Sequence, residues 1–135
     1  MTTATHPTAT QLADVLDKAI TVIGTNSWHR GYLYDEDQYW EQGTPPANCP
    51  VCALGAINIA ISGRPMLGIS GTLRLEDAVA LADAAAIAVA VHLKVGTTPR
   101  ALARWNDEEK RVVADVVQAF RDTAAELRAE AASHA

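Results

Sequence analysis

The sequence has no cluster of lysine or arginine, no long hydrophobic run and only two cysteines among its 135 residues. It holds 11 basic and 16 acidic residues, for a net charge of −5. Binding to a phosphate backbone requires several cationic contacts, so we expect no nucleic-acid partner. The most hydrophobic stretch, residues 84–91, is far shorter than the roughly 20 apolar residues that cross a bilayer, so we expect no membrane partner.

The N-terminal residues also lack the features of a secretory signal. Residues 1–8 contain no basic segment followed by an apolar run. The cytoplasm is therefore the expected compartment, and there Cys49 and Cys52 are expected as thiols rather than as a structural disulfide.

Apolar residues spaced three and four apart predict the first helices. Thr8 is expected to cap the first helix in a capping box with Gln11, and Gly24 is expected to end it. A second helix, apolar nearly all round, covers residues 50–61, with Pro50 in its first turn. A third spans residues 73–95, where interleaved alanines favour helix over strand.

Two further helices are expected in the C-terminal third of the chain. Thr98 and Pro99 have the residue types that begin a helix, and this short helix ends at Trp105. Asn106 and Glu109 are expected to form a capping box for a long last helix with a valine-rich apolar stripe.

These elements predict an all-α fold, a compact single-domain bundle of about five helices with one long aromatic loop. The helical domain covers residues 8–127, between a flexible N-terminal tail at 1–7 and a C-terminal tail at 128–135 that is expected to fray. A homodimer that forms through exposed alanine-rich helix faces remains an open alternative.

The long connection, residues 25–48, holds five of the seven aromatic residues: Trp28, Tyr32, Tyr34, Tyr39 and Trp40. A connection of this length in a small domain is usually functional or disordered, and disordered segments are poor in aromatic residues. We therefore expect a non-enzymatic binding or accessory domain in which these five residues and His29 contact a protein partner or a small molecule. The alternative is that Trp28 and Trp40 only pin the loop to the bundle.

A cysteine-dependent enzyme is the second hypothesis. Cys49 and Cys52 have Cys-x-x-Cys spacing, and with Pro50 at the first helical position Cys49 would be the exposed helix cap. The N–H groups at a helix start favour thiolate, so Cys52 is the candidate nucleophile for thiol redox chemistry or for acyl or thiol transfer, with Cys49 or His92 assisting. Whether the chain is an enzyme stays open, because a buried structural cysteine explains the same residues.

A cysteine–histidine pair also needs a residue that orients the imidazole, and Asn106 and Asp107 follow His92 in the required chain order. Helix capping by Asn106 and a place for His92 near a helix end are the structural alternatives. Structural zinc would require four ligands, and one Cys-x-x-Cys pair has no second half-site here, so we expect neither metal nor cofactor.

Three short motifs resemble a known family: Trp28 with Gly31, the segment Cys52 to Ile57, and Trp105-Asn106-Asp107 before a valine-rich helix. The pattern is similar to a domain-of-unknown-function family of small actinobacterial and phage proteins with a Trp-Asn-Asp signature, over roughly residues 8–127. The resemblance implies such a source and a compact domain, and it transfers no catalytic residue. Cys49 departs from the pattern, so chemistry built on the cysteine pair would be particular to this protein.

Overall fold

The computed structural model describes residues 6–67 and 73–133. Over these ranges the chain folds into six α-helices, one short 3-10 helix and two isolated β-bridges. The predicted all-α fold is confirmed, with one helix more than expected.

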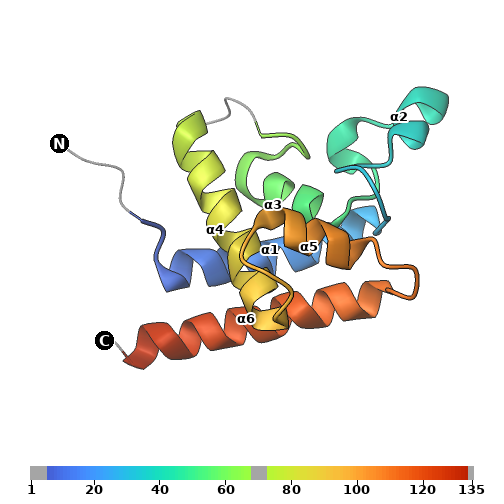
Figure 1. Cartoon of the computed structure of the whole chain (residues 1–135). Coiled ribbons are helices and arrows are strands. Elements are labelled where there is room, and N and C mark those ends of the chain that lie inside the picture. The colour runs from blue at the N-terminus through green and yellow to red at the C-terminus, as the bar shows by residue number, and fades with distance from the viewer. Residues whose placement is uncertain (1–5, 68–72, 134–135) are drawn as a thin grey trace.

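The first and last helices form the base of the bundle. Helix α1 (Ala9–Asn26) and helix α6 (Val113–Ser133) lie side by side, blue and red in Figure 1. The two helices run antiparallel: Arg128 near the end of α6 pairs with Asp14 and Asp17 near the start of α1. Helix α6 continues through Arg128 to Ser133 and so includes most of the tail at 128–135 that the sequence predicts to fray, whose last two residues lie outside the described ranges.

The other helices close the core above this pair. Helices α3 (Ala53–Ser62) and α4 (Leu75–Leu93) pack on α1 and on each other, and α5 (Pro99–Asn106) packs on α3 and α4. Their contact faces supply side chains that are fully removed from water: Leu16, Ile57, Val89, Leu102, Val116 and Phe120. Burial of this apolar surface is the main force that holds the helices together. No helix within the described ranges has both the length and the apolar character to span a membrane.

Several predicted helix ends are confirmed. The Thr8 hydroxyl accepts from the Gln11 amide at 3.1 Å, and the Gln11 side chain accepts from the Thr8 amide at 2.7 Å. Thr98 caps α5, with Pro99 in its first turn. Helix α1 passes Gly24, however, and ends at Asn26, whose side-chain amide donates to two carbonyls of residues 47 and 49. These contacts outweigh the modest cost of one helical glycine, about 1 kcal/mol.

The predicted start of α3 is wrong by three residues. The helix begins at Ala53, with Cys52 as its cap, and the chain before it is extended. The Val51 amide donates to the Ser27 carbonyl, and the Val51 carbonyl accepts from the His29 amide, each at 3.0 Å. Val51 is completely buried between the two bridged segments, so tertiary pairing holds this β-branched residue in an extended conformation.

The connection at 25–48 is also more regular than predicted. It contains helix α2 (Glu36–Gln42) and a 3-10 helix (Pro46–Asn48). Asp35 caps α2 through its carboxylate, which accepts from the Gln38 amide, and Gly43 ends it in the left-handed conformation at φ 71°. A helix of seven residues is too short to show a recognisable apolar periodicity in the sequence. In Figure 1, α2 projects from the bundle.

The predicted capping box before α6 does not form. Asn106 is the last residue of α5 and turns its side chain inward, and α6 begins only at Val113. The Asp115 carboxylate accepts from the Val112 amide at 3.1 Å and so serves the start of α6 instead.

Candidate functional site

The side-chain amide of Asn106 joins three parts of the chain. Its Oδ1 atom accepts from the indole Nε1 of Trp28 at 2.7 Å and from the backbone amide of Ala53 at 2.9 Å. Its Nδ2 atom donates to the Asp107 carboxylate at 3.0 Å and to the His29 carbonyl at 3.4 Å. Because Asn106 is completely buried, these bonds replace the water that it lost, and the residue is a structural anchor.

Arg30 and Gly31 fasten the same loop a second time. The Arg30 guanidinium lies over the Trp28 ring, 5.2 Å from its centroid, and donates to the carbonyls of residues 108, 109 and 111. The Gly31 amide donates to the Asp107 carboxylate at 2.8 Å. Gly31 has a φ of 105°, which favours glycine. The motif of Trp28 and Gly31 thus binds directly to the Trp-Asn-Asp motif, although the two are far apart in the sequence.

Trp28 therefore fits the pinning alternative better than the role of a free binding residue. His29 is also held within the loop, since its Nε2 atom donates to the Tyr32 carbonyl at 2.7 Å. The sequence analysis missed the anchoring roles of Arg30 and Asn106. The Trp-Asn-Asp motif was the available signal for Asn106, whereas nothing local marked Arg30.

The remaining four predicted aromatic residues touch ring to ring. The centroids of Tyr32 and Tyr34 are 5.6 Å apart, those of Tyr34 and Tyr39 6.4 Å, and those of Tyr39 and Trp40 5.0 Å. Tyr34 is buried, whereas Tyr32 is 47% exposed and Trp40 is 74% exposed. We call these four residues the aromatic row. Its outer members present large apolar surfaces to solvent, with a buried ring behind them.

Met66 extends the aromatic row at its Tyr32 end. The Tyr32 hydroxyl donates to the Met66 sulfur at 3.4 Å, and Met66 is half exposed. No local pattern connects residues 32 and 66, so the sequence analysis missed this neighbour.

Both cysteines are buried, which corrects the prediction that Cys49 is an exposed helix cap. The Cys49 thiol donates to the carbonyls of Thr44 at 3.4 Å and Pro45 at 3.5 Å. Cys52 is the actual cap, and its sulfur accepts from the Gly55 amide at 3.4 Å. Burial raises the pKa of both thiols, and the hydrogen bond from Gly55 offsets only part of this effect at Cys52.

His92 lies on α4 and its Nδ1 atom is 2.5 Å from the Glu126 carboxylate of α6. Asn106 lies beside Cys52, because its Oδ1 atom accepts from the backbone amide of the following residue, Ala53. Its side-chain Nδ2 atom, however, already donates to the His29 carbonyl. In the described part of the chain, no hydrogen bond joins His92 to Cys52, Asn106 or Asp107. The structure therefore does not bring the proposed cysteine, histidine and orienting residue together as a hydrogen-bonded set.

We expect Cys49 and Cys52 of the folded protein to react slowly with iodoacetamide. The thiolate is the reactive form, and the raised pKa of each thiol lowers the fraction of thiolate near neutral pH. The measurement is pulse labelling across a pH series, with peptide mass spectrometry to locate the label and urea-unfolded protein as the control. Fast labelling of either folded thiol near pH 7 would contradict this expectation and favour the enzyme hypothesis.

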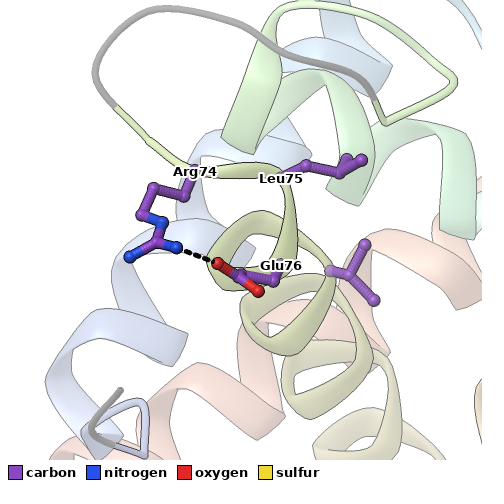
Figure 2. Close-up of a pocket in the computed structure, with 4 residues that line it drawn as sticks. Arg74, Leu75 and Glu76 are labelled. Carbon is purple, nitrogen blue, oxygen red and sulfur yellow. Dashed lines mark ion pairs between the residues drawn. The ribbon is translucent and has the colours of Figure 1, made fainter. Parts of the chain in front are cut away.

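A shallow open hollow lies at the start of α4. Figure 2 shows its lining residues Arg74, Leu75, Glu76 and Val79, and the ion pair of 2.5 Å between Arg74 and Glu76. It follows residues 68–72 in the chain, which lie outside the described residues, so we assign no site to it. Within 6–67 and 73–133, no group of three or more His, Cys, Asp or Glu side chains is placed to hold a metal ion.

Comparison with known proteins places the chain in a family without assigning it an activity. No curated protein and no solved structure matches the chain. A model of one protein family matches residues 7–126, which is nearly the whole domain and includes Asn106, Trp28 and the aromatic row. The chain belongs to this family, which is described as a family of unknown function (DUF6197).

Proposed function

We propose that this protein is a non-enzymatic binding module that contacts a protein partner through the aromatic row, with Trp40 as the main contact. Trp40 is 74% exposed on α2, which projects from the bundle. Exposure of an indole ring to water is unfavourable, and tryptophan is enriched among the residues that dominate binding energy in protein interfaces.

The shape of the surface favours a protein over a small molecule. Small-molecule sites are concave and enclose most of the ligand. Trp40 instead stands on a projecting helix, where a larger partner can cover it. The rings of Tyr39 and Trp40 pack edge to face, with their centroids 5.0 Å apart.

Backbone hydrogen bonds fasten the segment that leads into α2, and a fastened segment lowers the entropic cost of binding. The Asp35 amide before α2 donates to the Pro50 carbonyl at 2.8 Å, and the Cys52 amide donates to the Leu33 carbonyl at 3.4 Å. Together with the Asn106 anchor, these bonds fix the segment from which α2 starts, although α2 itself has no buried residue.

A protein partner also suits the charge and the thiols of the chain. The net charge of −5 disfavours nucleic acid, as the sequence analysis argued. Both cysteines are free thiols, which suits the cytoplasm, where we propose that the interaction takes place. Their burial offers no support for cysteine catalysis.

Trp40→Ala is the test. We expect at least about 30-fold weaker partner binding, corresponding to a loss of about 2 kcal/mol at an interface hot spot. Partner proteins would be captured from an extract of the source organism with wild-type and variant chains, compared by quantitative mass spectrometry, and the best candidate titrated by calorimetry. Val91→Ala, at an exposed apolar residue of α4, is the matched control. A partner that binds Trp40→Ala as tightly as the wild type would refute the proposal.

A further inference from the structure

We infer that the partner presents a basic segment whose arginine side chain lies over the Trp40 ring and is held by the carboxylates of α2. This inference rests on the proposed function and specifies the chemistry of the partner. Three separate features of the chain support it: the distribution of charge, the position of Glu41, and the use of arginine at the other two tryptophans.

The excess of negative over positive charge lies almost entirely in the segment that carries Trp40. Residues 31–63 contain four acidic residues and no lysine or arginine, and the rest of the chain contains 12 acidic and 11 basic residues. The segment that carries Trp40 therefore accounts for nearly all of the net charge of −5. A field of one sign attracts a partner of the opposite sign and speeds its association.

Two carboxylates lie beside Trp40 on the surface of α2, and a third is its neighbour in the sequence. Glu36 and Asp37 precede it by four and three residues, which places them beside Trp40 on the helix surface, and Glu41 follows it directly. All three are exposed, and none takes part in the ion pairs found within the described ranges. Among the described residues, no cation therefore forms an ion pair with these three carboxylates.

The helix alone does not account for all three of these acidic residues. Glu36 and Asp37 lie in the first turn, where the partial positive charge of the helix start stabilises them. Glu41 lies in the last turn, where the partial negative charge of the helix end disfavours an acidic residue. A local cost of this kind is typical of functional positions, and a cationic partner would offset it.

Arginine covers the other two tryptophans of the protein. The Arg111 guanidinium lies 3.9 Å from the centroid of the Trp105 ring, and that of Arg30 lies 5.2 Å from the centroid of the Trp28 ring. Trp40, the most exposed of the three, has no such cation over its ring in the part of the chain that the structure describes. A guanidinium over an indole face is a favourable cation–π contact, and adjacent carboxylates can pair with its N–H groups.

The test follows Trp40 directly in the full chain. The protein would be labelled with 5-fluorotryptophan, so that its three tryptophans give separate ¹⁹F signals, with Trp40 assigned from Trp40→Phe. Short peptides of Arg-Ser, Lys-Ser and Glu-Ser repeats of equal length would be titrated. We expect the Arg-Ser peptide to shift the Trp40 signal most, the Lys-Ser peptide less and the Glu-Ser peptide not at all, with the other two signals unmoved.

A triple variant tests the carboxylates. With Glu36→Gln, Asp37→Asn and Glu41→Gln together, we expect the Arg-Ser peptide to bind about 10-fold more weakly. The matched control makes the same change in net charge at exposed positions outside α2, with the substitutions Asp83→Asn, Glu109→Gln and Glu130→Gln. It should bind almost as the wild type does.

Several results would overturn the inference. These are an unmoved Trp40 signal with the Arg-Ser peptide, an equal response to the Glu-Ser peptide, and equal weakening in the control variant. A Trp40-dependent dimer in sedimentation would also do so, because a second copy would then be the occupant. If Trp40→Ala abolishes partner capture but the carboxylate variant does not, the proposed function stands and only the basic partner is wrong.

Discussion

Replacing Asn106 with alanine should lower the free energy of unfolding by about 4 kcal/mol. The Trp28 indole N–H and the Ala53 backbone amide would both lose their acceptor, the Asn106 Oδ1 atom. Each buried donor left unpaired costs about 1–3 kcal/mol. The variant should unfold at a clearly lower urea concentration when followed by far-ultraviolet circular dichroism.

Asn58→Ala is the control for this experiment. Asn58 is half-buried, and its side-chain amide donates to one carbonyl, that of Pro65, at 2.8 Å. Its loss should cost about 1 kcal/mol. Asn106→Asp keeps an acceptor at Oδ1 but sets a second carboxylate oxygen against that of Asp107, 3.0 Å away in a buried site, so it should not restore the stability. If Asn106→Ala costs no more than Asn58→Ala, Asn106 is not the anchor of the loop.

Gly55→Ala should destabilise the protein by about 3 kcal/mol. A Cβ atom at Gly55 would lie 1.9 Å from the Leu33 carbonyl oxygen and 2.9 Å from the Leu33 carbonyl carbon. These are backbone atoms, so the segment that leads into the aromatic row would have to move. The same oxygen accepts from the Cys52 amide at 3.4 Å, and that bond would be strained as well. Differential scanning calorimetry would show the effect as a lower Tm.

Gly24→Ala is the matched substitution for Gly55→Ala. Gly24 is an exposed residue of α1, and no atom lies within 4 Å of the position that its Cβ would take. Alanine is the better helix former, so this variant should be more stable by about 1 kcal/mol. An unchanged or higher Tm for Gly55→Ala would show that α3 and the Leu33 backbone are not packed this closely.

Structure that depends on local interactions could be predicted from the sequence. The capping box of Thr8 and Gln11, the start of α5 at Thr98 and the helical state of residues 75–93 were all predicted. Each depends on residues no more than about four positions apart, or on the sum of many helix propensities along one segment. Interactions of this range are visible in the chain itself.

Structure could not be predicted from the sequence where a distant contact overrides a local preference. Pro50 and Cys49 have the residue types of a helix start, yet pairing with residues 27–29 and 33–35 holds this segment extended. Asn106 has the residue type of a helix cap, yet it bonds to Trp28, which is 78 positions away. Cys49 is buried in this extended segment, and burial raises the pKa of its thiol. The Cys-x-x-Cys spacing alone had suggested a reactive thiol.

The sequence by itself determined the helical fold and the concentration of aromatic residues between α1 and α3, because both follow from residue type and spacing. The division of labour among those aromatic residues was settled in the folded state. Trp28 became part of the anchor and Trp40 was left exposed, although both are tryptophans of the same loop. The difference arises because the acceptor for Trp28 comes from the end of α5, and contacts across such a separation form only when the helices pack.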